Sequence, residues 1–539
     1  MNVAELLTRS ARERGTHAAI VEPGPRRSWR ITSFSELEAD CDAIGHGLRE
    51  RGVVPGDRVA VFVRPGRDLI ALAYALWKIG AVPILIDPGM GRANVARCLE
   101  RTRPRVLIGV LLAHLLRRLE RARLGSIEIA LLVGRALPGI ETLAGTRRPE
   151  RGHLLAHAAS SDETAAILFT SGSTGAPKGV VYTHGIFRAQ LDALRALYGF
   201  RPGERDLACF PLFALFDAAL GTTAVIPQLD PLRPAQCEPA DVALAIQQHG
   251  CTYGFGSPAI WKRVAPWARA NGVRFPTLTR ALVAGAPVST TLIGSLRELL
   301  APGGDVHTPY GATECLPVSS LSGAELADGL RERVEGGHGS CVGRVAPGVE
   351  VAIVPVVDGP LACIERLATA EIGEICVRGA VVTRAYADDP AATERAKVHD
   401  GGVVWHRTGD AGYVDADGFL WTVGRVAHRV ECAEGRRWPV MLENVCDLHP
   451  RVLRTALVGA GGTTLIVEPV GGARRSVAER AQLLAEMHAL VAAKRVSGAP
   501  LPLAVPVRLL EHEHFPVDVR HNAKIRREDL ALWAGERGP

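Results

Sequence analysis

The chain has 539 residues, of which 47% are hydrophobic and 22% are charged. This length exceeds the roughly 100–200 residues of one domain, and the composition is that of a globular protein with a large core. The formal net charge of +6 is small for the length, and charges of one sign form no block, which argues against nucleic acid as a partner.

The eleven cysteines stand singly in the sequence, without a Cys-x-x-Cys pair. This pattern argues against a disulfide framework and against a zinc site, and it suits a reducing compartment. The first ten residues are too polar for a signal peptide, and no apolar run approaches the roughly 20 residues of a membrane-spanning helix. We therefore expect a cytoplasmic protein.

The first two thirds of the chain alternate short apolar runs with helix-like stretches. Residues 59–63 read as a strand, 69–79 as a helix and 82–86 as the next strand. Further short strands are expected at 166–169 and 281–284. Buried strands that alternate with helices indicate parallel α/β layers.

Residues 111–124 predict a basic amphipathic helix. The favoured interpretation is a helix that packs on the sheet and exposes a solvated face. A contact of this helix with a membrane surface or a partner is the alternative.

The sequence pattern changes near residue 346, after which turns separate strands expected at 350–354, 373–377 and 418–423. This pattern predicts antiparallel pairing. The last 110 or so residues predict a separate small α+β unit, with strands within 452–467, a helix at 478–491 and a strand at 505–510. We place the boundary at residues 424 and 425.

The strongest local signal is residues 170–179, which combine three glycines, four hydroxyl-bearing side chains and Lys178. Glycines let backbone N–H groups approach an anion, and a lysine adds charge. The spacing does not match the Walker pattern, and the chain contains no G-x-S-x-G nucleophile elbow. The segment therefore predicts a phosphate-binding loop of another kind.

Three other segments carry polar groups suited to a nucleotide. Residues 310–314 place an aromatic ring and a carboxylate around a turn, although Thr313 could equally cap a helix there. Asp410 suits two ribose hydroxyls and Arg425 suits ribose or phosphate oxygens, while Asp410 as a simple turn residue is the alternative. Lys524 is one of only six lysines, although a lysine in a loop is usually just solvated.

Together these segments resemble the adenylate-forming superfamily of acyl-CoA synthetases, peptide-synthetase adenylation domains and luciferases, over essentially the whole chain. The resemblance implies an α/β fold. Its large N-terminal domain, residues 1–424, would hold layered α/β subdomains and a small β-barrel-like part, and a small mobile α+β domain would span 425–539. It also implies ATP and Mg²⁺ as cofactors and acyl-adenylate formation without a covalent nucleophile on the protein.

The resemblance assigns a role to each matching residue. Tyr310 would contact adenine, Thr313 the α-phosphate, Glu314 the magnesium ion and Asp410 the ribose. Lys524, with Lys178, would stabilise charge on the carboxylate and the α-phosphate. The implied nucleotide-binding residues are Thr170, Ser171, Gly172, Ser173, Thr174, Gly175, Lys178, Gly285, Ala286, Pro287, Tyr310, Gly311, Thr313, Asp410 and Arg425.

Three departures from the superfamily pattern concern delivery of a thiol. Ala214 replaces a usual histidine, and Ala427 replaces a hinge residue that is usually acidic or a lysine. Residues 431–439 replace the loop that opens the thiol tunnel. These departures argue against CoA or a carrier protein as the acyl acceptor.

Residues 213–221, 310–317 and 516–524 resemble a narrower group, the β-lactone synthetases of bacterial olefin and β-lactone biosynthesis. The implied substrate is a β-hydroxy acid, often a long-chain 2-alkyl-3-hydroxy acid, whose own hydroxyl closes the ring. Thiolase, reductase and β-lactone decarboxylase enzymes would be pathway partners. A long-chain acyl-CoA or acyl-carrier ligase is the first alternative, and a non-catalytic acyl-adenylate-binding protein is the second.

Aromatic residues beside glycines suggest where an alkyl chain would lie, with ordinary core packing as the alternative. A base that assists ring closure would come from a histidine or a carboxylate, and each candidate could equally be structural. The candidate pocket residues are Phe213, Phe216, Gly254 and Gly256, and the candidate bases are His184 and Asp217.

Overall fold

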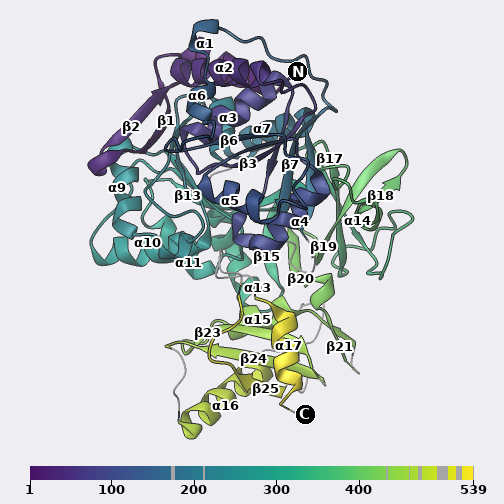
Figure 1. The fold of residues 1–539 in the computed structure, drawn as a ribbon. Coiled ribbons are helices and arrows are strands. Elements are labelled where there is room, and N and C mark those ends of the chain that lie inside the picture. Colours follow the sequence, from purple (N-terminus) through teal and green to yellow (C-terminus); the bar gives the residue numbers. More distant parts are fainter. Residues whose placement is uncertain are drawn as a thin grey trace.

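The computed structural model describes residues 1–170, 177–210, 213–432, 435–460, 462–471, 476–493, 508–517 and 525–537. These residues form two large sheets covered by helices, a two-stranded hairpin and a three-stranded sheet near the C-terminus. Figure 1 shows the C-terminal elements as a smaller body below the large sheets.

The first large sheet has six strands in the order β6-β5-β3-β4-β7-β8. Strands β3 to β7 pair in parallel, and β8 pairs with β7 in the antiparallel sense. The strands are β3 (Arg58–Phe62), β4 (Val82–Leu85), β5 (Val106–Gly109), β6 (Ile129–Leu132), β7 (Thr164–Thr170) and β8 (Lys178–Thr183). The predicted parallel α/β layer is confirmed.

Alternate residues along β3 serve the two faces of this sheet. Val59 and Val61 belong to the buried cluster that also holds helices α1 (Ala4–Arg14), α2 (Phe34–Glu50) and α3 (Arg67–Ile79). Ala60 belongs instead to the cluster of helices α4 (Arg92–Thr102) and α5 (Leu111–Leu119). Because side chains alternate across a strand, both faces of the sheet are covered by helices.

Helix α3 confirms the helix expected at 69–79, and its burial explains the sequence. All eleven residues from Leu69 to Ile79 are buried, which is typical of a helix that is apolar on every side. The helix ends at Gly80, whose φ of 76° lies in the left-handed region that favours glycine.

Helix α5 is shorter than the helix predicted for 111–124. It ends at Leu119, and the N–H groups of Arg123 and Leu124 both donate to the carbonyl of Glu120 in a turn. Leu124 is then buried in the same cluster as α4 and α5. The turn therefore ends the helix while Leu124 still packs with α4 and α5.

The second large sheet has fourteen strands, in the order β16-β17-β19-β20-β15-β14-β13-β12-β11-β9-β10-β1-β2, with β18 paired to β19. From β1 to β13 along this order the neighbours are parallel, and from β13 to β16 they are antiparallel. The parallel part and its edge strand are β1 (Ala18–Pro23), β2 (Trp29–Ser33), β9 (Arg205–Ala208), β10 (Thr223–Val225), β11 (Tyr253–Gly256), β12 (Arg280–Val283) and β13 (Asp305–Ala312).

Within the described residues the antiparallel part has seven strands, three of which match the strands predicted at 350–354, 373–377 and 418–423. They are β14 (Cys315–Ser322), β15 (Ser340–Val345), β16 (Val349–Val354), β17 (Gly373–Gly379), β18 (Lys397–Asp400), β19 (Val403–Val414) and β20 (Leu420–Arg425). Within the described residues these strands do not close on themselves, so the expected barrel-like part is an open extension of the large sheet.

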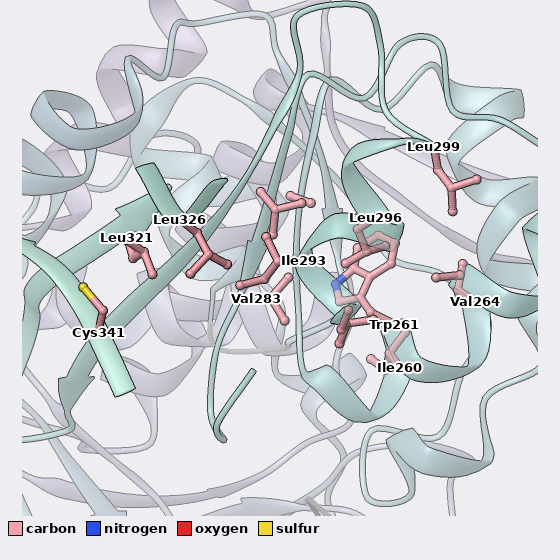
Figure 2. Packing of buried hydrophobic residues seen from close by; sticks show 14 of the residues in the cluster. Ile260, Trp261, Val264, Val283, Ile293, Leu296, Leu299, Leu321, Leu326 and Cys341 are labelled. Carbon is pink, nitrogen blue, oxygen red and sulfur yellow. The ribbon is translucent and has the colours of Figure 1, made fainter. Parts of the chain in front are cut away.

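A large apolar core lies between this sheet and its helices. Trp261 on α10 (Pro258–Ala270) is completely buried, among residues of β12 and of α11 (Thr290–Arg297). Figure 2 shows Trp261 beside Leu296, with Ile293 and Val283 close by. The remaining helices that precede the C-terminal elements are α6 (Leu143–Thr146), α7 (His184–Tyr198), α8 (Ala214–Leu220), α9 (Pro239–His249), α12 (Gly323–Glu325), α13 (Arg331–Glu335) and α14 (Pro390–Ala396).

The C-terminal elements begin after β20. They are β21 (Val430–Cys432), β22 (Gly435–Arg437), α15 (Pro439–Cys446), β23 (Val452–Gly459), β24 (Thr463–Pro469), α16 (Val477–Ala493), β25 (Arg508–Glu511) and α17 (Arg527–Gly535). The ion pair of Arg527 with Glu443, with N···O distances of 2.5 and 2.7 Å, joins α17 to α15. The domain boundary at 424 and 425 stays a prediction. Among the described helices, none combines the length and the apolar character needed to cross a bilayer.

Candidate active site

One cavity of about 2930 Å³ collects most of the predicted nucleotide residues. Ligand pockets usually measure roughly 300–1,000 Å³, so this cavity has room for a nucleotide and a long acyl chain together. The predicted residues that line it are Lys178, Gly285, Ala286, Pro287, Tyr310, Gly311, Thr313, Glu314, Asp410 and Arg425.

The expected ribose site is already ordered by its neighbours. The Tyr310 hydroxyl donates to Oδ2 of Asp410 at 2.7 Å, and Nε of Arg425 lies 3.2 Å from Oδ1 of the same carboxylate. Asp410 and Arg425 are also direct cross-strand partners on β19 and β20. The Asp410 charge raises the pKa of Arg425, so the cation is retained. A fixed carboxylate with spare lone pairs can accept two more hydroxyl hydrogens.

Glu314, the expected magnesium ligand, is held by a tyrosine that the sequence analysis missed. The Tyr386 hydroxyl donates to Oε1 of Glu314 at 2.8 Å, and Nζ of Lys178 lies 5.1 Å from the centre of the Tyr386 ring. Burial and the Glu314 charge raise the pKa of Tyr386, so its hydroxyl stays a donor. A local sequence motif could not predict this contact, because Tyr386 is 72 residues from Glu314.

The turn that carries Thr313 and Glu314 is anchored through its backbone. The Tyr182 hydroxyl on β8 donates to the Thr313 carbonyl at 2.5 Å, and the Thr383 N–H donates to the Glu314 carbonyl at 2.9 Å. Behind Thr383, Nζ of the buried Lys397 donates to its hydroxyl at 3.2 Å. Burial lowers the pKa of Lys397 to about 8. Lys397 is a second residue that no sequence motif indicated.

Part of the predicted phosphate site lies outside the described residues. This applies to Ser171, Gly172, Ser173, Thr174 and Gly175, and to Lys524. The flanking strands are described, and Thr170 at the end of β7 pairs with Lys178 at the start of β8. Ile525, the neighbour of Lys524 in the sequence, lines the same cavity.

The apolar part of the cavity is aromatic. Phe213 stacks on Phe255 with ring centres 4.3 Å apart, and Phe216 lies 5.6 Å from Phe213. Phe210 and Phe255 are 5.8 Å apart, and all four rings line the cavity. The prediction of an acyl pocket at Phe213 and Phe216 is consistent with this position.

Gly254 and Gly256 lie in β11 but are not among the residues that line the cavity. A methyl group at Gly256 would lie only 2.8 Å from Nε1 of Trp261, and one at Gly254 would lie 3.0 Å from Cβ of Leu207. The two glycines therefore make room for core packing rather than for a ligand.

The structure places both candidate bases away from the cavity surface. His184 is 2% exposed, accepts the Val3 N–H on Nδ1 at 3.1 Å, and has its pKa lowered to about 4 by burial. Asp217 is fully buried and accepts the hydroxyls of Tyr253 at 2.7 Å and Thr222 at 2.9 Å. Neither lines the cavity, so these positions give no support to a role in proton transfer.

Asp217 belongs to a buried carboxyl pair with Asp206. Burial raises the pKa of Asp217 to about 6, and burial together with the Asp217 charge raises that of Asp206 well above its usual range. Asp206 also accepts the Phe255 N–H at 3.2 Å. Because two neighbouring buried carboxylates repel each other, the pair favours holding one proton, and the raised pKa of Asp206 assigns that proton to Asp206.

Comparisons with known proteins agree with this site. A family model described as AMP-binding enzyme matches residues 7–387. An olefin beta-lactone synthetase of Xanthomonas campestris pv. campestris is 43% identical, covering 99% of this chain and 98% of that protein. Another, of Stenotrophomonas maltophilia, is 42% identical over 99% of this chain and 98% of its own length.

The amide bond synthetase McbA from Marinactinospora thermotolerans shares the fold, with a TM-score of 0.80 at 22% identity, covering 98% of this chain and 99% of that chain. The resemblance to adenylate-forming enzymes and to β-lactone synthetases, expected from the sequence motifs, is confirmed. The chain belongs to the AMP-binding enzyme family and is an ATP-dependent, AMP-forming ligase.

Proposed function

We propose that this ligase adenylates a β-hydroxy acid and closes it to a β-lactone, with a long-chain 2-alkyl-3-hydroxy acid as the substrate. The observation that carries the proposal is the joint cavity, in which the polar residues around Asp410 and Glu314 share one space with the phenylalanines around Phe213. The relatives named olefin beta-lactone synthetase support the same reaction.

In the first step, a carboxylate oxygen of the acid attacks the α-phosphorus of ATP and pyrophosphate leaves with the bonding electron pair. Asp410 would hold the ribose, and Lys178 would offset negative charge that develops on the phosphate. The carboxylate of Glu314 suits Mg²⁺, which prefers oxygen ligands and substrate phosphates. When bound, the ion would neutralise phosphate charge, and Tyr386 would keep the Glu314 side chain in place.

In the second step, the substrate hydroxyl attacks the acyl carbon, the bond from that carbon to the phosphate oxygen breaks, and AMP leaves. The hydroxyl proton is released, and a four-membered lactone remains. The enzyme must hold the hydroxyl close to the acyl carbon and exclude water. The apolar wall formed by Phe213 and Phe255 suits both tasks.

The replaced thiol-delivery residues support an internal acceptor. Ala214 is buried at the start of α8, and Ala427 lines the cavity without offering a charge. The described residues of the segment that replaces the usual tunnel loop form the hairpin strands β21 and β22. Enzymes of the thiolase and reductase classes would supply the hydroxy acid, and a β-lactone decarboxylase would consume the product.

The test is product analysis with ATP, Mg²⁺ and a synthetic 2-alkyl-3-hydroxy acid, with and without CoA. The expected products are pyrophosphate, AMP and a β-lactone in amounts that CoA does not change. A matched 2-alkyl acid that lacks the hydroxyl should release pyrophosphate but yield no lactone. A CoA thioester as the main product would overturn the proposal in favour of an acyl-CoA ligase.

A further inference from the structure

A second apolar wall lines the same cavity, far from the phenylalanines in the sequence. It consists of Leu112, Leu115, Leu116 and Leu119 on α5. Leu116 packs on the buried cluster against the sheet, but Leu112 is 72% exposed and Leu119 65% exposed. Most of this leucine wall therefore has no protein partner within the described residues, although large apolar side chains gain by leaving water.

The topology of the six-stranded sheet explains why a crevice lies beside α5. The chain runs from β3 to β4 on one side and then crosses to β5 on the other side of β3. Connections that leave two neighbouring parallel strands in opposite directions open a crevice at their carboxyl ends. These two strands are β3 and β5, and residues 63–65 after β3 and Val110 after β5 line the cavity at this point. Figure 1 shows α5 beside α4 in front of this sheet.

The crevice and the aromatic part of the cavity lie against one buried cluster. Val63, which follows β3, and Phe216 on α8 both pack on the cluster built around α2 and α3. Ile226, which follows β10, packs on it as well and also lines the cavity. Val63 and Ile226 therefore share a buried cluster with Phe216, whereas the leucine wall packs on the separate cluster of α4 and α5 and meets them only in the cavity.

We propose that the crevice beside α5 binds one of the two alkyl chains of a branched 3-hydroxy acid, the branch carried on C2, while the phenylalanines bind the main chain. The inference rests on the proposed function. In such an acid both chains begin within two bonds of the reacting carbonyl carbon. One site must therefore send two apolar chains in different directions, and the cavity has two apolar ends.

The alternative to an alkyl chain is a lipid surface, which exposed leucines on a basic helix can also bind. The contacts of α5 favour the alkyl chain. Arg117 turns inward and donates to the carbonyl of Ile127 at 3.0 Å, so it does not add to an outward basic face. The leucine wall is also part of the cavity that holds Asp410 and Glu314, which a separate docking face would not require.

The test uses two matched variants of α5. Leu115 and Leu111 are each 47% exposed, but only Leu115 lines the cavity. We would compare Leu115→Gln with Leu111→Gln, using 3-hydroxy acids with a fixed main chain and C2 branches of increasing length. The readout is pyrophosphate release, which reports adenylation whether or not a lactone follows.

In the wild type, KM should fall by up to about fourfold for each methylene added to the branch, until the crevice is filled. Leu115→Gln should flatten this dependence while short-branched acids keep the wild-type kcat and KM. It should leave the dependence on main-chain length unchanged. Leu111→Gln should behave as the wild type with every acid.

An unchanged branch dependence in Leu115→Gln would overturn the inference, as would an equal loss with every acid. Sedimentation with vesicles of phosphatidylcholine and phosphatidylglycerol tests the competing occupant. Vesicle binding that Leu115→Gln abolishes, with the branch series unchanged, would identify a lipid-docking face instead. Failure of the proposed function is a separate result, because a thioester product would leave the branch series intact.

Discussion

The buried carboxyl pair of Asp206 and Asp217 predicts how stability changes with pH. The folded protein keeps a proton on Asp206 that the unfolded chain loses near pH 4, because burial and the Asp217 charge raise the pKa of Asp206. A raised folded-state pKa means that this contribution to stability is complete at low pH and is lost as the pH rises. Asp206→Asn should remove the dependence, since an amide side chain carries no titrating proton.

The size of the effect follows from proton linkage. While the folded state binds one more proton than the unfolded state, the free energy of unfolding falls by about 1.4 kcal/mol per pH unit. Asp217, with its pKa raised to about 6, is largely ionised above pH 6.5 and adds little further slope. Over the pH range in which folded Asp206 keeps its proton, Asp206→Asn should therefore gain about 1.4 kcal/mol per pH unit relative to the wild type.

The assay is urea unfolding followed by tryptophan fluorescence at several pH values between 6.5 and 8. The matched control is Asp162→Asn, because the side chain of Asp162 is 70% exposed and its mutation should leave the pH slope of the wild type unchanged. Parallel curves for Asp206→Asn and the wild type would refute the shared proton.

Three further predictions concern the core and the nucleotide site. Gly256→Ala should lower the free energy of unfolding, measured by thermal unfolding, by about 1–3 kcal/mol, because its Cβ would lie 2.8 Å from Trp261. The control Gly125→Ala should be neutral in the same measurement, because the nearest atom to its Cβ is 3.9 Å away. Asp410→Asn should raise the KM for ATP by about 10- to 100-fold in a pyrophosphate-release assay, since it removes a charged hydrogen-bond acceptor; an unchanged KM would count against the ribose role. The pKa of Lys397 is lowered to about 8, so its burial penalty is complete below pH 8 and fades toward pH 10.4. The stability of Lys397→Met relative to the wild type should thus fall by about 2 kcal/mol from pH 8 to pH 10, and a constant difference in the urea midpoint would contradict this.

Local motifs predicted residues that gather in one cavity, because each motif carries its chemistry within a few residues. Tyr310, Glu314 and Asp410 come from separate segments, and the structure brings all three to one cavity. Their supports could not be predicted in the same way. Tyr386 donates to Glu314 and Lys397 donates to Thr383, and no spacing in the sequence indicates which of these side chains will face each other.

Burial was the harder property to predict. Phe216 and Asp217 are neighbours on α8, yet only Phe216 reaches the cavity, because successive residues of a helix point in different directions. Glycine was ambiguous for a similar reason: Gly256 indicates a close approach, but the sequence does not say that the approaching group is Trp261. The parallel and antiparallel parts of the fold were predictable because strand periodicity extends over many residues.

The pairing of Asp410 with Arg425 has a mechanical consequence. Arg425 is the last residue of β20, and its side chain also donates to the Thr408 carbonyl at 2.8 Å. The carboxylate expected to hold the ribose and the final residue before the C-terminal elements thus lie in one hydrogen-bonded ladder. Any rotation of the C-terminal elements must therefore have its hinge beyond Arg425. Such a rotation would leave the ribose of the nucleotide in place.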